Sequence, residues 1–181
     1  AYSNRGLAWA QKGETDKAVA DYTKAIEIDP TFSDAYLNRG LTYFDKGELD
    51  KAVYDFTKTI YYTPDSIPAY SNRALAYSKK GSLNQAIYDC GRMIEINPKY
   101  SDAYGERGFI YYKKGNLDQA IEDYTKALEI DHTFADVYFN RGVAYADKGD
   151  HDRAILDYNK ALEIDPEYDA AFANRALAYG K

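Results

Sequence analysis

An all-α fold, built as an array of antiparallel helical hairpins, is predicted by two features of this sequence. A signature, AYLNRG at residues 35–40, returns every 34 residues along the chain. Within the five full repeats, apolar and small residues recur at helical spacing, and the pattern is interrupted first by a glycine and then by a proline, which only His132 replaces. A period of 34 residues is typical of helical hairpin repeats, so the function is expected on a surface that the array builds.

The signature keeps strict register from one end of the sequence to the other. The copies are AYSNRG at 1–6, AYLNRG at 35–40, AYSNRA at 69–74, AYGERG at 103–108, VYFNRG at 137–142 and AFANRA at 171–176. They divide the chain into repeats at 1–34, 35–68, 69–102, 103–136 and 137–170, followed by a half repeat at 171–181. We therefore expect a single array over residues 1–181. Because the sequence begins and ends inside the pattern, we expect it to be part of a longer protein.

Each repeat is expected to form two helices joined by a tight turn. In the second repeat, helical spacing runs from Tyr36 to Tyr43 and breaks at Gly47. A second run, from Ala52 to Ile60, ends before Pro64, because proline cannot continue a helix. The break glycines are Gly13, Gly47, Gly81, Gly115 and Gly149, and the closing prolines are Pro30, Pro64, Pro98 and Pro166.

The charge of the chain limits the classes of partner. The formal net charge is -6 and the pI is about 5.0. Nucleic-acid binding depends on clustered lysines and arginines that neutralise phosphates, so we expect no nucleic-acid partner. A basic or neutral partner suits the negative field of the chain better.

Several other classes of function are also disfavoured. The single cysteine, Cys90, excludes an internal disulfide, and no apolar run approaches the roughly 18 residues of a membrane span. His132 and His151 fall at predicted turns without a cluster of metal ligands, and no phosphate loop or nucleophile–base pair recurs. We therefore expect no enzyme activity, no cofactor, no metal and no membrane insertion. The sequence names no compartment, and without a targeting segment the cytoplasm is favoured.

The residues that recur within each repeat carry a resemblance to a known family. They are Tyr2, Gly6, Trp9, Ala18, Tyr22, Ala25 and Pro30 in the first repeat, and Tyr138, Gly142, Tyr145, Ala154, Tyr158, Ala161 and Pro166 in the fifth. Over its whole length the sequence resembles the tetratricopeptide repeat (TPR) family. The resemblance implies a right-handed superhelical solenoid, in which the first helices of the hairpins line a concave groove that binds a protein or peptide.

Each signature contains an arginine on the packed side of its helix. On a helical wheel Arg39 lies beside Tyr36 and Tyr43, and an aspartate recurs with the same period in the second helices. We expect each aspartate to pair with the arginine of an adjacent first helix, for example Asp21 with Arg39, and to fix the register between neighbouring hairpins. Removing one partner of such a half-buried pair is expected to cost roughly 3 kcal/mol or more.

One stripe of the first helices is not explained by packing, and asparagine is its most regular residue. The asparagines are Asn4, Asn38, Asn72, Asn140 and Asn174, and Glu106 interrupts the series. An asparagine side chain offers the donor and acceptor of a peptide bond, so a row of them can hold an extended backbone. The resemblance implies that TPR proteins with such rows hold peptides in this way. The alternative is that these asparagines only solvate a helix face or bond to neighbouring repeats.

Beside the asparagines runs an apolar row. Its members are Leu7, Leu41, Leu75, Phe109, Val143 and Leu177. Exposed apolar rows of this size usually mark an interface, so we expect the groove to bind an extended peptide or a helix. Lys79 and Lys113, near the ends of two first helices, are candidates to meet an acidic group of the ligand, or are only solvated.

The pattern changes at one place, where the third repeat joins the fourth. Cys90 replaces an aromatic residue, Met93 replaces a small residue, and Gly91 lies between them. Gly105 and Glu106 then open the following helix. We expect a change of curvature or a specificity pocket here, in which Glu106 receives a lysine or arginine of the ligand.

Three functional hypotheses follow. The first is a non-catalytic scaffold that binds a peptide or helix in the groove. The second is self-association into a homo-oligomer, through the groove or through the terminal half repeat, where Leu177 and Tyr179 are expected to be exposed. The third is an RNA-binding array with a ladder of stacked tyrosines, which the net acidity and the inward direction of the tyrosines disfavour.

Overall fold

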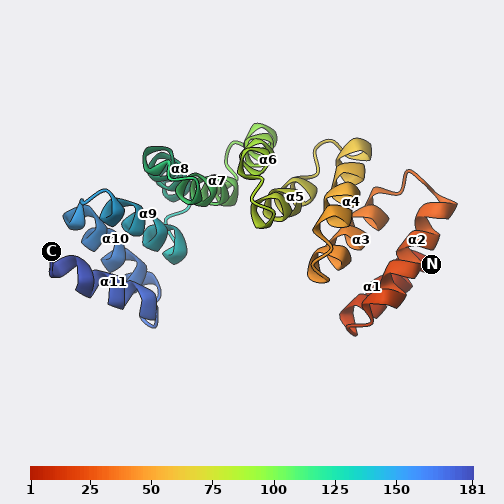
Figure 1. Ribbon diagram of the computed structural model, residues 1–181, viewed down its shortest axis with the longest axis horizontal. Coiled ribbons are helices and arrows are strands. Elements are labelled where there is room, and N and C mark those ends of the chain that lie inside the picture. The colour runs from red at the N-terminus through yellow and green to blue at the C-terminus, as the bar shows by residue number, and fades with distance from the viewer. The chain divides into compact units, whose positions relative to one another are not determined.

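The structure, a computed structural model, describes residues 1–181, and every element in it is an α-helix (Figure 1). The helices are α1 (Tyr2–Gln11), α2 (Thr15–Ile28), α3 (Ser33–Asp45), α4 (Leu49–Tyr62), α5 (Ile67–Lys79), α6 (Leu83–Ile96), α7 (Ser101–Lys113), α8 (Leu117–Ile130), α9 (Ala135–Asp147), α10 (His151–Ile164) and α11 (Asp169–Tyr179). They form five hairpins followed by one further helix, so the predicted all-α hairpin repeat is confirmed.

The chain consists of two compact units, residues 1–92 and 93–181, and the division falls within α6. In both units the two helices of a hairpin pack against each other, and the second helix packs against the first helix of the next hairpin. First helices of successive hairpins also touch, in the pairs α1–α3, α3–α5, α7–α9 and α9–α11. Within each unit, the first helices therefore form one continuous face.

The predicted break glycines terminate the first helices. Each of them has a φ between +76° and +81°, a left-handed conformation that glycine adopts without strain. At the end of α3, Gly47 N donates to the Phe44 carbonyl at 2.9 Å and Glu48 N donates to the Tyr43 carbonyl at 2.8 Å. These two bonds are those of a Schellman motif, which satisfies the last carbonyls of a helix.

Small residues of the signature allow the two helices of a hairpin to approach closely. A Cβ atom built on Gly40 would lie 2.8 Å from Cε1 of the buried Phe56, and one on Gly142 would lie 2.7 Å from Cε1 of Tyr158. Aromatic rings therefore occupy the space that a side chain on these glycines would need.

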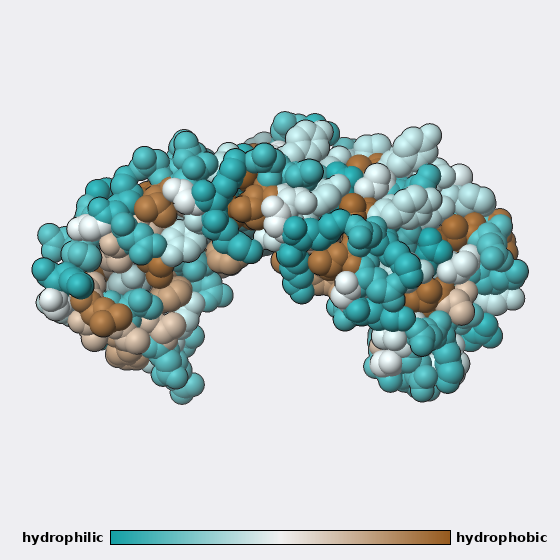
Figure 2. All heavy atoms as spheres, in the orientation of Figure 1, coloured by the Kyte–Doolittle hydropathy of each residue, from teal (hydrophilic) through white to brown (hydrophobic).

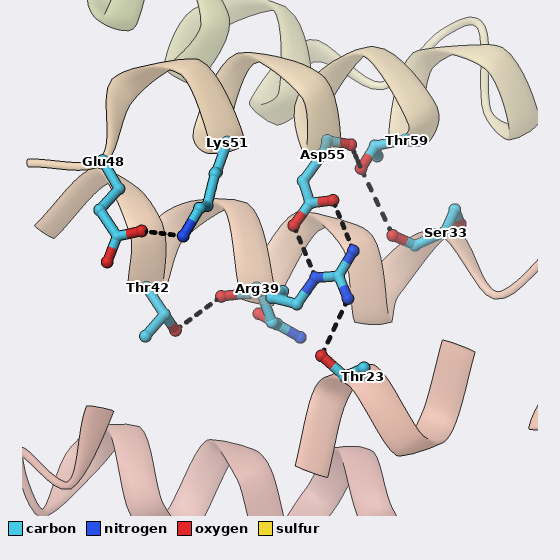
Figure 3. A network of polar contacts seen from close by, with 9 residues as sticks. Thr23, Ser33, Arg39, Thr42, Glu48, Lys51, Asp55 and Thr59 are labelled. Carbon is cyan, nitrogen blue, oxygen red and sulfur yellow. Dashed lines mark hydrogen bonds and ion pairs between the residues drawn. The ribbon is translucent and has the colours of Figure 1, made fainter. Parts of the chain in front are cut away.

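Arginine and aspartate pair within a hairpin, so the predicted pairing of Asp21 with Arg39 is wrong. Asp21 binds Arg5, and Asp55 accepts hydrogen bonds at 2.8 Å from both Nε and Nη2 of Arg39 (Figure 3). Along the sequence, the two members of a pair are the same number of residues away from the tight turn. They therefore lie opposite each other when the two helices pack antiparallel. Arg39 Nη1 also donates to Thr23 Oγ1 of the preceding hairpin at 2.9 Å, so a threonine makes the contact between hairpins.

Candidate functional site

The six residues of the predicted asparagine stripe all lie on first helices, and none of them is buried. They are Asn4, Asn38, Asn72, Glu106, Asn140 and Asn174. Asn72 Nδ2 donates to the Pro68 carbonyl at 2.8 Å, and Asn174 Nδ2 donates to the Ala170 carbonyl at 2.9 Å. Each of these bonds uses one amide hydrogen on the preceding turn of the same helix. The binding role of the stripe stays a prediction.

The predicted apolar row divides into exposed and packed members. Leu7, Leu75 and Phe109 are exposed, by 46%, 48% and 44% respectively. Leu41 is half-buried, because it packs against a cluster that includes Ala76 of the next first helix. Val143 packs in the same way against a cluster that includes Ala178 of α11. Contact between successive first helices therefore covers part of the row.

The two lysines of the predicted groove lie over aromatic rings. Lys79 Nζ is 4.4 Å from the centroid of the Phe44 ring, and Lys113 Nζ is 5.6 Å from the centroid of the Phe109 ring. Both separations are within the range of cation–π attraction. Both lysine side chains are exposed, and each ammonium group lies over one aromatic ring.

A pocket of about 620 Å³ lies between α7 and α9 in the C-terminal unit. It brings together Glu106, Phe109 and Asn140, three of the residues predicted for the groove. The rest of the lining comes from α7, α9 and the turns that precede them, and from the start of the turn after α10. These residues are Tyr100, Asp102, Gly105, Thr133, Phe134, Ala135, Asp136, Val137 and Asp165.

Gly105 lines the pocket without a side chain. The same register carries Leu37 in α3 and Phe139 in α9, two residues that pack against the core clusters of their own hairpins. A Cβ built on Gly105 would meet only Val137 Cγ2, at 3.4 Å, which is ordinary van der Waals contact. A larger side chain at this position would extend into the pocket.

The pocket is acidic. Its lining contains the carboxylates of Asp102, Glu106, Asp136 and Asp165 and no lysine, arginine or histidine. Burial, and then the charges of Asp102 and Glu106, raise the pKa of Tyr100. Tyr168 donates a hydrogen bond to Asp136 Oδ1 at 2.8 Å. Burial is the larger cause that raises the pKa of Tyr168, and this hydrogen bond is the second. Of these four carboxylates, that of Asp136 therefore accepts a hydrogen bond from a neutral hydroxyl group.

Comparison with known families identifies the repeat. Sequence models described as TPR repeat match residues 6–47, 40–81 and 108–149, and models described as tetratricopeptide repeat match residues 67–100, 135–168 and 90–122. The chain belongs to the tetratricopeptide repeat family. The matches run through most of its length, as the 34-residue register of the signature predicts.

Solved structures of other TPR proteins are similar to this one. A crystal structure of MamA is 33% identical, with a TM-score of 0.84 over 90% of this chain and 95% of that chain. The structure of YrrB, a TPR protein described as having an unusual peptide-binding site, is 26% identical, with a TM-score of 0.81 over 97% of this chain and 91% of that chain. A TPR protein from Parabacteroides merdae is 21% identical, with a TM-score of 0.88 over 99% of this chain and 71% of that chain, and shows the shared fold. A comparison with proteins of curated function finds no match.

Two further features bear on what this TPR protein can do. No helix combines the length and the apolar character that crossing a membrane requires. No group of three or more histidine, cysteine, aspartate and glutamate side chains is arranged to hold a metal ion.

Sequence analysis missed the contribution of the turns to the pocket of this TPR protein. Tyr100 and Phe134 precede α7 and α9, and Asp165 follows α10. A signal was present, because an aromatic residue occurs at this register at Phe32, Tyr100, Phe134 and Tyr168. The prediction of a site considered only the helices, and so it left out residues that close the pocket from the side.

Proposed function

We propose that this TPR protein is a non-catalytic scaffold that binds an extended segment of another protein on the first-helix face of its C-terminal unit. The observation that carries the proposal is the pocket between α7 and α9, which combines apolar walls with polar groups at one place. Pockets of this size and mixed lining are the usual form of a binding site.

The lining matches what an extended peptide presents. Asn140 offers both an acceptor and a donor, which can meet a peptide carbonyl and a peptide N–H. Phe109 and Val137 offer apolar surface to a side chain, and Gly105 leaves room for it. YrrB, which has the same fold, is described as having an unusual peptide-binding site, and this description supports the same class of ligand here.

Filling the pocket tests the proposal. A random peptide library is selected against the wild-type chain, and the affinity of a selected peptide is measured by fluorescence anisotropy. Gly105→Leu is expected to weaken binding at least tenfold, because the new side chain occupies the space of the ligand. Gly105→Ala is the matched control and should bind nearly as well as wild type, since its Cβ has room.

Folding of the variants is checked by thermal unfolding. Alanine and leucine both form helices more readily than glycine, so neither variant should melt below wild type. The proposal fails if the library yields no specific peptide, or if selected peptides bind the Gly105→Leu variant as tightly as wild type.

Self-association is a second candidate function, and the open face of α11 favours it. Leu177 is 68% exposed, and Phe172 and Tyr179 are exposed beside it. Ala176 is exposed too, whereas the corresponding residues Gly6, Gly40, Ala74, Gly108 and Gly142 are buried under a second helix. Figure 2 shows apolar residues gathered over α11 near the C-terminus. A second copy of the chain that packs against α11 would remove these apolar side chains from water.

Light scattering over a series of protein concentrations distinguishes this second function. Self-association through α11 predicts a mass that rises with concentration, and Leu177→Lys should lower that mass by placing a charge in the apolar contact. A monomer at all concentrations would exclude this candidate and leave the peptide-binding proposal unaffected.

A further inference from the structure

The exposed face of α11 corresponds to a surface that a second helix covers in the hairpins. It consists of four residues at the spacing of one side of a helix, Phe172, Arg175, Ala176 and Tyr179. Another side of α11 packs on α10, since Ala171 shares a cluster with Ala161, and Ala178 shares one with Ala154. The helix α11 therefore has one side that is packed and one largely apolar side that is exposed.

The arginine of this face lacks the carboxylate that its counterparts bind. In each of the five hairpins, Nε and Nη2 of the signature arginine donate to the two oxygens of an aspartate in the second helix. Arg175 donates through Nη1 alone, to Asn159 Oδ1 of α10 at 2.7 Å. Its Nε and Nη2 are therefore able to bind a carboxylate of another molecule.

The guanidinium group of Arg175 is already placed for such a contact. The bond from its Nη1 to Asn159 corresponds to the bond from Arg141 Nη1 to Thr125 Oγ1, which is 3.0 Å long, in the preceding hairpin. The guanidinium carbon also lies 5.2 Å from the centroid of the Phe172 ring, within the range of cation–π attraction. A carboxylate that binds here would not have to order a free arginine.

The α9–α10 hairpin indicates which helix fits this face. Asp157 of α10 accepts hydrogen bonds at 2.8 Å from Nε and Nη2 of Arg141. Ala154, three residues before this aspartate, and Ala161, four residues after it, are fully buried. A matching helix therefore carries an aspartate between two alanines on its apolar side.

The residue after the aspartate is set by Ala176. In α9–α10, a Cβ on Gly142 would lie 2.7 Å from Cε1 of Tyr158, so an aromatic ring does not fit opposite an alanine. The α5–α6 hairpin has alanine in this register, at Ala74, and there the small residue Cys90 follows the aspartate. A helix that covers α11 is therefore expected to have a small residue directly after its aspartate.

We propose that the exposed face of α11 binds an amphipathic α-helix of another protein, in which an aspartate is followed by a small residue and flanked by the two alanines. The aspartate binds Nε and Nη2 of Arg175, and the small residue packs on Ala176. A second copy of the chain is a poorer occupant, because each equivalent aspartate already binds the arginine of its own hairpin, at Asp21, Asp55, Asp89, Asp123 and Asp157.

A peptide taken from the chain itself tests the proposal. It spans residues 150–164 and carries Tyr158→Ala, and it keeps Asp150, whose side chain caps α10. Fluorescence anisotropy of the labelled peptide should show saturable binding to the wild-type chain. Circular dichroism should show added helix, because so short a peptide is mostly unfolded alone. The same peptide with Asp157→Asn should bind about tenfold more weakly, as expected for loss of hydrogen bonds between charged groups.

Two protein variants show whether Arg175 makes the contact. With Arg175→Ala, the aspartate peptide and the asparagine peptide should bind within about threefold of each other, because their difference depends on this arginine. Arg5→Ala is the matched control, since Arg5 is the most exposed of the paired arginines, and it should leave the tenfold difference in place. Thermal unfolding checks that both variants are folded.

The size of the residue after the aspartate gives an independent test. The peptide that keeps Tyr158 should bind the wild-type chain more weakly than the peptide with Tyr158→Ala, because its ring meets the Cβ of Ala176. Ala176→Gly should reverse this order, since the ring then gains the space that it has over Gly142. Such a reversal places the peptide on α11.

Several results would overturn the inference. It is wrong if neither peptide binds, if Arg175→Ala leaves the tenfold difference unchanged, or if Ala176→Gly does not alter the order of the tyrosine and alanine peptides. Self-association through α11 that excludes the peptide would assign this face to a second copy, and would also overturn it. Gly105→Leu should leave all these affinities unchanged, because the α7–α9 pocket has no lining residue from α11, so this inference and the peptide-binding proposal fail independently.

Discussion

Arg39 donates two hydrogen bonds to Asp55 across the α3–α4 hairpin, and this pair differs from its counterpart in the first hairpin mainly in burial. The Asp55 side chain is fully buried and that of Arg39 is 13% exposed. The equivalent Arg5 is 60% exposed and makes the same two bonds to Asp21. The same contact therefore occurs once with a nearly buried arginine and once with an exposed arginine, and the two copies can be compared.

Replacing Arg39 with alanine is expected to destabilise the protein by about 3 kcal/mol or more. The change leaves the carboxylate of Asp55 buried without its cation, and it removes the bond to Thr23 of the preceding hairpin. Urea unfolding followed by circular dichroism measures the loss. Arg5→Ala is the control and should have a much smaller effect, because water can solvate Asp21 once the exposed arginine is gone. Equal losses for the two variants would contradict this account.

Gly40→Ala is expected to destabilise the protein by about 1–3 kcal/mol, because its Cβ would lie 2.8 Å from the Phe56 ring. The third repeat indicates how the clash is avoided. There the same two positions hold Ala74 and Cys90, both buried, so a larger residue on one helix is matched by a smaller one on the other.

A double-mutant cycle tests this size matching. In the background of Phe56→Cys, Gly40→Ala should become neutral or stabilising, since the ring that it meets is absent. Thermal or urea unfolding of the four proteins gives the coupling. The same cost for Gly40→Ala in both backgrounds would show that the ring does not restrict this position.

Gly91→Ala is expected to stabilise the protein by roughly 0.5–1 kcal/mol. Gly91 lies inside α6, its φ is not positive, and a Cβ would have no neighbour within 4 Å, so alanine gains helix propensity without a clash. The control is Gly81→Ala, in the turn before α6, where φ is +76°. Alanine is strained in that conformation, so this variant should lose stability, and a gain for both or a loss for both would contradict the prediction.

The contact between Asp16 and Lys46 predicts a dependence of stability on pH. The Lys46 hydrogen bond lowers the pKa of Asp16 below 3.8, and the Asp16 bond raises the pKa of Lys46 above 10.5. The contribution of Asp16 is complete above pH 3.8 and is lost as the pH falls through its lower value in the folded chain. The contribution of Lys46 is complete below pH 10.5 and is lost as the pH rises through its higher folded value.

Asp16→Asn isolates this contact from the other acidic groups. Unfolding free energies of wild type and variant are compared over a range of pH. The difference between the two unfolding free energies should be constant near neutrality. It should shrink as the pH falls below 3.8, because protonation then removes the negative charge of Asp16 in the wild type, and asparagine has no charge at any pH. A difference that persists unchanged in acid would mean that the ion pair does not contribute to stability.

The candidate site was partly predictable from the sequence. Asn140, Phe109 and Glu106 were expected on one face from the register of the signature, and they line one pocket. Leu41 belongs to the same pattern, but it packs toward Ala76 of the next first helix. A helical wheel identifies the face on which a residue lies, but not the neighbour that covers it.

By itself, the sequence determined the helices, the glycine turns, the 34-residue register and the TPR family, because helical periodicity, proline and glycine act over short stretches of chain. Only the tertiary structure decided that Asp55 meets Arg39 of its own hairpin, which members of the apolar row stay exposed, and that Gly105 lines a pocket. These properties depend on the distances between helices that are remote in sequence, and on the volume that side chains of one helix leave unfilled against the next.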